Sequence, residues 1–303
     1  MLHVLFQILN FFYQLIIGCI KAILPYGILP RKDVKGKVIL ITGGGNGLGK
    51  NLAIAFGKLG SKVVLWDIDK KNLDLTIKQL KTLDVECHSF IVDVTNKDLI
   101  YETAKKVKET IGPVDILINN AGIANGKPFL QTTDEALKRI MDINIFSHFY
   151  TCKAFIPDML ERKTGHIVTM ASLSGKVPAL GIVDYSTTKF AAVGFSSALE
   201  EELKVLSNDK IKVTTICPYF IRTDIIANFD IQSIPMLPVL EPEEAVEIMM
   251  EGILTDQSQI LLPKFCYILS LMYSLLPTKA FYTIVETKSL KDKFCELAGI
   301  SSN

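Results

Sequence analysis

The sequence of 303 residues has almost no excess charge of either sign: 33 Lys and Arg stand against 32 Asp and Glu, for a net charge of +1. No basic run is interleaved with aromatic side chains, so the pattern excludes a nucleic-acid partner. The six cysteines form no CxxC pair and have no histidine at metal-ligand spacing. Scattered cysteines in a chain of this length are typical of reduced thiols in a cytosol-facing protein. We predict neither disulfides nor a metal site.

A second absence is local, because no Lys, Arg, Asp or Glu occurs between Val4 and Ile20. The mean hydropathy of +0.32 is high for a soluble enzyme, and the apolar excess gathers at the two ends of the chain. A cleaved signal peptide would need a basic start and a small-residue cleavage site, and the segment offers neither. A spanning anchor needs about 20 apolar residues, which is close to the length available here.

A helix lying in the membrane interface is the third interpretation, and the spacing of the polar residues favours it over a full span. One face of such a helix stays near water while the other enters lipid. A helix buried against the following domain is a weaker alternative, because the domain predicted below begins at its first strand. Steps of three and four residues place one polar stripe along the apolar segment: His3, Gln7, Asn10, Gln14, Gly18 and Lys21.

A basic cluster follows this apolar segment. After Pro25, Gly27 and Pro30 come four cations, which are Arg31, Lys32, Lys35 and Lys37. Positive charge directly after an apolar segment holds the following chain on the cytoplasmic side. We therefore predict that residues 1–30 form a hydrophobic membrane anchor and that the rest of the chain faces the cytosol.

A glycine-rich loop between a strand and a helix is the strongest local motif. Residues 38–41 form a short apolar run typical of a buried parallel strand, and a helical pattern follows the loop and ends at Gly60. The glycines let backbone N–H groups approach a pyrophosphate at the positive end of the helix. The alternative is a turn with a purely structural role, but such a turn would not need a strand before it, a helix after it and an acid downstream. The loop residues predicted to bind a dinucleotide are Gly43, Asn46, Gly47, Leu48 and Gly49.

An acid at the end of the second predicted strand bears on the choice of dinucleotide. Asp67 follows Gly49 by 18 residues (67 − 49), near the separation expected of the acid that binds the adenosine ribose. A carboxylate there accepts hydrogen bonds from the 2′-hydroxyl and repels a 2′-phosphate. We therefore predict NAD as cofactor, with NADP the less favoured choice. Lys70 and Lys71 lie nearby, and we assign them to a solvated helix face.

Strand and helix patterns then alternate along the chain. Apolar runs at residues 89–92, 115–118 and 166–170 are predicted strands, with a charged amphipathic helix at about residues 97–111. This alternation predicts an α/β fold, a single Rossmann-type domain with a doubly wound parallel sheet, over residues 36–262. Ligand groups are expected at the carboxyl ends of the strands.

A candidate catalytic set follows the strand at residues 166–170. Ser172 lies just beyond that strand, and Tyr185 and Lys189 share one face of the next helix because they are four residues apart. A free phenol has a pKa near 10, and a cation on the next turn is expected to lower it. Tyr185 would then take the proton of an alcohol while Ser172 holds the reacting oxygen. A tyrosine–lysine pair alone is usually a surface pair, so the prediction rests on its context.

Together these motifs resemble the short-chain dehydrogenase/reductase superfamily over residues 36–262. The resemblance implies a nicotinamide cofactor, a usual homodimer or tetramer, a water relay supported by Asn144, and Lys189 on the nicotinamide ribose. The implied catalytic set is Asn144, Ser172, Tyr185 and Lys189. The further residues implied to contact the cofactor are Asp93, Asn120, Ala121, Gly122, Tyr185, Lys189, Pro218 and Thr223. This chain departs from the family pattern after Pro218, where the bulky Tyr219 is expected to shape the substrate pocket.

The sequence is more similar to one membrane-associated branch, which contains epidermal retinol dehydrogenases and lipid-droplet 17-beta-hydroxysteroid dehydrogenases. Segments at residues 64–68, 189–195 and 238–242, the apolar N-terminus and the hydrophobic tail carry this resemblance. It implies the endoplasmic reticulum membrane or the lipid droplet as location, with the catalytic domain facing the cytosol.

Two apolar segments are expected on the substrate side. The residues from Thr223 to Leu237 include many large apolar side chains and are predicted to form a lid, the alternative being a loop packed on the core. Residues 265–276 are too short to span a bilayer comfortably and are predicted to form a helix resting on the membrane or on a partner. The tail after Lys288 is polar and is expected to fray.

Three functional hypotheses follow. The leading one is oxidation of a long apolar alcohol such as retinol to its aldehyde by NAD at a membrane surface. The second is a 17-beta-hydroxysteroid or other lipid-alcohol dehydrogenase that uses the same residues. The third is a lipid-droplet scaffold protein whose dinucleotide-binding domain performs no turnover, and the complete set Asn144, Ser172, Tyr185 and Lys189 argues against it.

Overall fold

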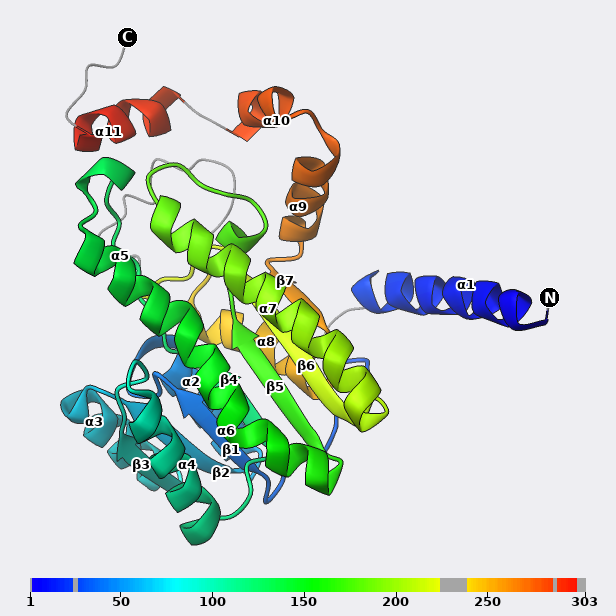
Figure 1. Cartoon of the computed structure of the whole chain (residues 1–303), viewed down its shortest axis with the longest axis vertical. Coiled ribbons are helices and arrows are strands. Elements are labelled where there is room, and N and C mark those ends of the chain that lie inside the picture. The colour runs from blue at the N-terminus through cyan, green and yellow to red at the C-terminus, as the bar shows by residue number, and fades with distance from the viewer. Residues whose placement is uncertain (1, 24–26, 224–238, 286–287, 299–303) are drawn as a thin grey trace.

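The computed structural model describes residues 2–23, 27–223, 239–285 and 288–298. Within them the centre of the molecule is a sheet of seven parallel strands in the order β3-β2-β1-β4-β5-β6-β7 (Figure 1). This sheet confirms the predicted fold. The strands are β1 (Val38–Thr42), β2 (Lys62–Asp67), β3 (Cys87–Ile91), β4 (Ile116–Asn119), β5 (Gly165–Met170), β6 (Ile211–Pro218) and β7 (Gln259–Leu262).

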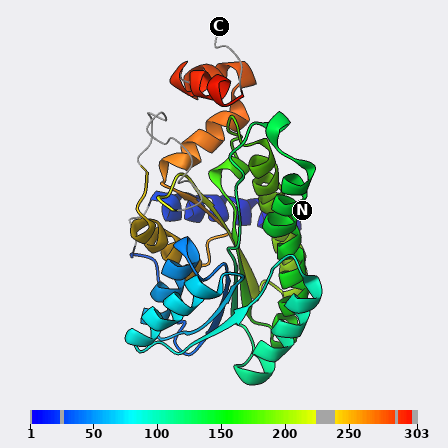
Figure 2. The same cartoon turned by 90° about the vertical axis from the view of Figure 1, so that its left-hand side faces the viewer.

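Helices cover both faces of the sheet (Figure 2). Both faces of β1 are covered, which explains why its residues from Val38 to Ile41 are all apolar. Ile39 and Ile41 pack into one helical layer, and Leu40 packs into the other. The first layer consists of α2 (Gly47–Lys58), α3 (Lys70–Thr82) and α8 (Pro242–Leu254). The second consists of α4 (Lys97–Thr110), α6 (Ser147–Arg162) and α7 (Val183–Ser207).

The order of the strands creates the crevice in which a ligand can bind. β1 pairs with both β2 and β4, so the chain runs outward in one direction from β1 and later returns to the other side of it. At this reversal the loops after β1 and β4 diverge, which leaves an opening at the carboxyl edge of the sheet. The short helix α5 (Asp134–Met141) and the π-helical turn η2 (Asp142–Phe146) lead from that edge into α6.

The N-terminal segment forms the helix α1 (Leu2–Ile23), which projects from the domain (Figure 1). All side chains at residues 5–13 are exposed, including Phe6 at 68% and Phe11 at 61%. The alternative of a helix buried against the domain is therefore wrong for these residues. No helix in the described ranges has both the length and the apolarity to cross a membrane.

The basic linker after α1 is held on the domain by ion pairs beside α8. Arg31 Nε donates to the carboxylate of Glu251 at 2.7 Å, and Glu251 is only 2% exposed. Lys32 Nζ donates to Asp256 and to Nδ1 of the buried His166. Because Nδ1 accepts from an ammonium, Nε2 of His166 carries the proton and donates to Thr214 Oγ1 at 2.8 Å. Burial and then the charge of Lys32 hold the pKa of His166 well below its ordinary value.

The C-terminal region is more ordered than the sequence predicts. The helix expected at residues 265–276 is confirmed as α9 (Phe265–Leu275), and α10 (Thr278–Val285) packs on it, with the ring centroids of Phe281 and Tyr273 5.1 Å apart. The expectation of a frayed tail after Lys288 is wrong over α11 (Lys288–Ala298). A Cβ on Gly181 would lie 3.4 Å from the ring of Phe294, so α11 is in contact with the loop before Tyr185.

Two further sequence predictions concern the lid after Thr223 and the state of the cysteines. The predicted lid lies outside the described residues, apart from its first residue, Thr223. The cysteines whose side chains the structure describes are all free thiols: Cys87, Cys152, Cys217, Cys266 and Cys295.

Candidate active site

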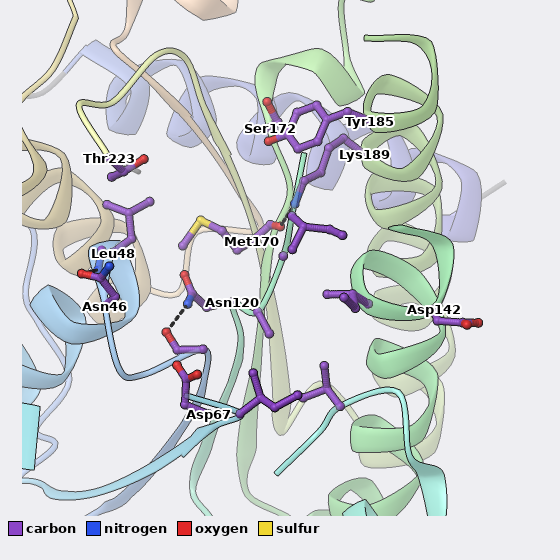
Figure 3. Close-up of a pocket in the computed structure, with 18 of the residues that line it drawn as sticks. Asn46, Leu48, Asp67, Asn120, Asp142, Met170, Ser172, Tyr185, Lys189 and Thr223 are labelled. Carbon is purple, nitrogen blue, oxygen red and sulfur yellow. Dashed lines mark hydrogen bonds between the residues drawn. The ribbon is translucent and has the colours of Figure 1, made fainter. Parts of the chain in front are cut away.

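A pocket of about 650 Å³ opens at the carboxyl edge of the sheet, where the loops after β1 and β4 part. Ser172, Tyr185 and Lys189 lie together at one end of it, and Asp67 lies at the other (Figure 3). Of the predicted site residues, only Gly49 and Asn144 do not line this pocket. Those that do are Gly43, Asn46, Gly47, Leu48, Asp67, Asp93, Asn120, Ala121, Gly122, Ser172, Tyr185, Lys189, Pro218 and Thr223.

Hydrogen bonds fasten the loop after β1 to the end of β4. The hydroxyl of Thr42 accepts from the backbone N–H groups of Asn120 and Ala121, both at 3.0 Å. In return the Asn120 amide donates to the carbonyl oxygens of Thr42 at 2.9 Å and Gly43 at 3.1 Å. The two loops are thereby fixed relative to each other, and we name these four contacts the Thr42–Asn120 clasp.

Gly49 lies behind the pocket wall, where there is no room for a side chain. A Cβ at this position would lie 2.1 Å from the carbonyl oxygen of Gly43 and 2.7 Å from the amide nitrogen of Asn120. The first turn of α2 therefore packs directly on the Thr42–Asn120 clasp. The N-terminus of α2 consequently points into the pocket, and its partial positive charge favours an anionic group there.

Acidic side chains line the end of the pocket opposite Ser172 and Tyr185. One carboxylate oxygen of Asp67 accepts from the backbone N–H of Gly45 at 2.8 Å, and the other accepts from that of Asp69 at 2.9 Å. These bonds fix the carboxylate against the glycine-rich loop. Asp93 accepts from the backbone and the hydroxyl of Thr95 and also lines the pocket. The end of the pocket therefore carries fixed negative charge.

The hydroxyl groups of Ser172 and Tyr185 form the reactive end. Ser172 begins the turn after β5, where its hydroxyl accepts from the backbone of Ser174 at 3.1 Å. Tyr185 reaches toward it from α7, and the two side chains lie together at this end of the pocket (Figure 3). Burial raises the pKa of Tyr185, and the hydrogen bond with Ser172 offsets part of that rise.

Lys189 is buried beside this pair, with 4% of its surface exposed. Its ammonium donates to the carbonyl oxygen of Met170 at 2.9 Å and lies 5.5 Å from the centroid of the Tyr185 ring. Burial lowers the pKa of Lys189 to about 8. The expectation of a lowered Tyr185 pKa is wrong in this arrangement, because the loss of hydration around the buried phenol raises it.

Asn144 supports the pocket from behind, at 0% exposure within η2. Its side chain accepts from the backbone N–H of Ile123 at 2.9 Å and donates to the carbonyl oxygen of Ile123 and the hydroxyl of Thr188. The amide thus ties the loop after β4 to α7, the helix that carries Tyr185 and Lys189. The side chain holds the site together and does not face the pocket.

Several residues of the site were not anticipated from the sequence. Thr42 directly follows the predicted strand at residues 38–41, and its position did not indicate that its hydroxyl binds backbone groups at the end of β4. Asp184 is 3% exposed and joins Asn125, at 2.6 Å, to the backbone N–H of Tyr185. Met170 acts through a backbone carbonyl, which the residue type does not reveal. Tyr219, which is expected to shape the substrate pocket, lines this pocket.

The pocket fits a dinucleotide with a free ribose hydroxyl. The N-terminus of α2 faces its middle, a fixed carboxylate lies at one end, and Ser172 and Tyr185 lie at the other. Lys70 is paired with Asp74 at 2.8 Å on the outer face of α3, and neither Lys70 nor Lys71 lines the pocket. Proton transfer to or from an oxygen held by Ser172 is the chemistry that the reactive end can perform.

Comparison with known proteins agrees with this geometry. Residues 37–233 match the family model described as short chain dehydrogenase. The chain is 42% identical to estradiol 17-beta-dehydrogenase 11 of Homo sapiens over 258 residues, 85% of each chain, and 39% identical to epidermal retinol dehydrogenase 2 of Homo sapiens over 275 residues, 90% of this chain and 88% of that one.

A solved structure shows the same fold. It is a short chain dehydrogenase/reductase from Burkholderia phymatum, in complex with NAD, with a TM-score of 0.73 and 23% identity. The match covers 80% of the present chain and 94% of that one.

We predict that Gly49→Ala weakens dinucleotide binding. The added methyl group cannot fit beside the carbonyl of Gly43, so the first turn of α2 must move off the Thr42–Asn120 clasp. Titration of NADH fluorescence measures the affinity, with an expected loss of at least about tenfold, equal to about 1.4 kcal/mol.

Gly57→Ala is the matched control, because Gly57 is also buried in α2 and a Cβ there would lie 2.6 Å from Val85 side-chain carbons. Both variants should unfold at lower temperature than the parent, but only Gly49→Ala should bind NADH more weakly. Equal affinities in the two variants would contradict the role given to this turn.

Proposed function

The chain belongs to the short chain dehydrogenase family and is an alcohol oxidoreductase, and we propose that it interconverts retinol, or another lipophilic alcohol, and the corresponding carbonyl compound with NAD at a membrane surface. The observation that carries the reaction is the placement of Ser172 and Tyr185 together at one end of the pocket, beside the buried Lys189. A 17-beta-hydroxysteroid is the second candidate substrate, because one relative is named for retinol and another for estradiol.

In the proposed reaction NAD, when bound, accepts hydride from the carbinol carbon. Ser172 holds the alcohol oxygen, and Tyr185 takes its proton as the carbonyl forms. Lys189 is fixed by Met170 close to the tyrosine ring, where its charge favours the deprotonated phenol. Asn144 and Asp184 keep α7 in register with the loop after β4, so they position Tyr185 without touching the substrate.

The preference for NAD over NADP rests on Asp67. Its carboxylate is fixed by the backbone of Gly45 and Asp69 at the adenosine end of the pocket. A 2′-phosphate there would meet a fixed negative charge, and neither Lys70 nor Lys71 lines the pocket to offset it. A ribose hydroxyl can instead donate to the carboxylate.

Burial of Tyr185 determines how the reaction should respond to pH. A raised pKa keeps the phenol protonated at neutral pH, ready to donate to a carbonyl oxygen. Oxidation of an alcohol needs the deprotonated form, whose fraction increases as pH rises toward that pKa. Oxidation should therefore accelerate with increasing pH, and reduction should be faster at neutral pH.

Exposed apolar helices support a membrane location, on the endoplasmic reticulum or a lipid droplet with the domain facing the cytosol. The side chains described in α1 include large apolar groups with more than half of their surface exposed. Leu271 and Leu275 of α9 are 58% and 73% exposed. The backbone contact between Lys32 and Leu254 at 2.8 Å brings the linker after α1 to α8, which precedes β7 and α9. Both apolar helices therefore leave the domain close to the β7 edge of the sheet.

We further propose a homodimer that forms through α6 and α7. Three phenyl rings on this side are exposed by more than 40%, which is unusual for a monomer surface. They are Phe146, Phe149 and Phe190.

The central prediction concerns turnover. The full chain in detergent should form NADH from NAD with retinol, estradiol or a long-chain secondary alcohol, and form NADPH from NADP at least about tenfold more slowly. The rate should increase between pH 7 and pH 9, because the deprotonated fraction of Tyr185 grows as the pH approaches its raised pKa. Tyr185→Phe should lose at least about a hundredfold in kcat, since it removes the proton acceptor.

NADH binding should survive in Tyr185→Phe, which serves as the control for folding. If the parent chain binds NADH yet oxidises none of the three alcohols at any pH, the scaffold hypothesis is favoured. Equal turnover in the parent and Tyr185→Phe would contradict the assignment of the site.

A second prediction tests the membrane surface. Leu9→Glu should reduce co-flotation of the full chain with phosphatidylcholine vesicles or with triolein droplets, because a carboxylate cannot enter lipid. Leu206→Glu is the matched control, since Leu206 is 64% exposed and Leu9 is 60% exposed. If both variants float as the parent does, α1 is not the anchor.

The dimer is tested by light scattering in solution. The parent should have about twice the 33.6 kDa mass of one chain. Phe149→Glu should halve that mass by placing charge in the interface, and Leu75→Glu should not, because Leu75 is exposed on α3 in the opposite helical layer. A parent that is monomeric at all concentrations would overturn the proposal.

A further inference from the structure

A short turn with two apolar side chains protrudes from the domain between β4 and α5. Phe129 and Leu130 belong to the helical turn η1 (Phe129–Gln131), and they are 55% and 94% exposed. Leu130 is the most exposed large apolar side chain of the described residues. Single exposed apolar residues are common on protein surfaces, so exposure alone does not identify a binding surface. The rigidity and the position of η1 distinguish it from such residues.

Hydrogen bonds hold η1 in one shape. The backbone N–H of Gln131 donates to the carbonyl oxygen of Pro128 at 2.9 Å, and that of Thr132 donates to the carbonyl oxygen of Phe129 at 3.1 Å. The hydroxyl of Thr132 also donates to the carbonyl oxygen of Pro128, at 3.3 Å. Pro128 is buried, and its ring fixes the backbone where the turn begins. The two apolar side chains are therefore presented on a rigid support, so little conformational entropy is lost when another surface covers them.

The turn η1 lies at the rim of the pocket. Ile123 precedes it in the sequence and Glu135 follows it, and both of these residues line the pocket. Within the same segment the amide of Asn125 donates to the carboxylate of Asp184 at 2.6 Å, directly before Tyr185. This bond fixes the segment that carries η1 to the start of α7, next to the reactive end of the pocket. A surface that covers η1 therefore lies beside the pocket.

The neighbouring loop before α7 adds apolar surface at this rim. Leu180 and Val183 are both exposed on it. The contact between Gly181 and the ring of Phe294 brings α11 to the same loop. In both views α9, α10 and α11 lie at the end of the molecule where α5 and α7 begin (Figures 1 and 2). The rim therefore shares one end of the molecule with α9, whose exposed leucines support the proposed membrane location.

A lipid surface fits the shape of η1 better than a protein partner does. A specific protein interface buries about 800 Å² of each partner, whereas η1 is a single protruding turn with two large apolar side chains. Lipid closes around a protruding side chain, and the apolar groups are stabilised there because they leave water. The charge near the turn is mixed, since Lys127, Asp134 and Glu135 are all exposed. Binding at this rim therefore does not require an anionic lipid.

We propose that Phe129 and Leu130 insert into a phospholipid surface, so that the pocket opens beside the lipid in which its alcohol substrate dissolves. The inference rests on the proposed function and adds a lipid contact made by the domain itself, separate from α1 and α9. In this arrangement α1 holds the chain on the membrane, and η1 determines which side of the domain faces the lipid.

Tryptophan fluorescence of the full chain tests the insertion directly. The sequence has one tryptophan, Trp66, which is fully buried and so gives a constant background. In Leu130→Trp the added emission should shift to the blue when phosphatidylcholine vesicles are present. Phosphatidylcholine brominated on its acyl chains should quench it at least about twofold, as expected for a side chain at a depth of about 5–10 Å. Leu75→Trp is the matched control and should stay unquenched, because Leu75 is 57% exposed on α3, away from α9 and α11 (Figure 1).

Transfer of substrate from vesicles gives a second measurement. Leu130→Glu should lower kcat/KM for retinol supplied in phosphatidylcholine vesicles about tenfold, because a carboxylate cannot enter the lipid. In detergent its turnover and its affinity for NADH should equal those of the parent chain, since Leu130 does not line the pocket. Leu75→Glu should equal the parent chain in both media.

Quenching of Leu130→Trp but not of Leu75→Trp, together with slower use of vesicle-borne retinol by Leu130→Glu, supports the insertion. An unquenched Leu130→Trp would overturn it, and so would a Leu130→Glu variant that uses vesicle-borne retinol as fast as the parent chain. Blue-shifted emission of Leu130→Trp without lipid would place the side chain in a protein interface and would also overturn it. If the parent chain oxidises no alcohol, the proposed function fails while the quenching still decides the insertion, so the two failures are distinguishable.

Discussion

The active site depends on the Thr42–Asn120 clasp, which joins the ends of β1 and β4 where the strand order reverses. Parallel strands leave their last backbone groups unpaired at the carboxyl edge, and the clasp satisfies several of them with side chains. It also fixes the place where Gly49 and the first turn of α2 can pack. The pocket is therefore preformed by backbone geometry, and the helix N-terminus is aimed into it before any ligand binds.

Burial determines the chemistry at the other end of the pocket. Removing Lys189 from water lowers its pKa to about 8, and removing Tyr185 from water raises the pKa of the phenol. The two pKa values, which are similar in water, thereby move apart, so the buried phenol holds its proton more tightly than the buried ammonium does. Asn144 keeps them together by joining the loop after β4 to α7. The π-helical turn η2 supports this contact, since it lies between α5 and α6 and carries Asn144.

The sequence was sufficient for the fold and for most residues of the pocket, because both depend on local patterns. The sequence itself shows these patterns, which are the glycine spacing, the strand composition and the four-residue separation of Tyr185 and Lys189. It does not show the role of the Thr42 hydroxyl, because that role arises from pairing with β4, which is distant in sequence. The pKa of Tyr185 was wrongly anticipated because burial cannot be read from a motif. Helix α11 was not predicted because its sequence is largely polar, and the contact between Phe294 and Gly181 joins residues that are distant in sequence.

Transfer of deuterium from a lipid alcohol to NAD tests the central claim most directly. Retinol deuterated at the carbinol carbon would be presented in phosphatidylcholine vesicles to the full chain with NAD, and the NADH formed would be weighed by mass spectrometry. The account predicts that every NADH carries one deuterium and that the retinal formed retains the other. Formation of NADH that carries no deuterium would contradict the account. So would a chain that binds NAD but transfers no deuterium to it, either from the deuterated retinol or from a deuterated 17-beta-hydroxysteroid.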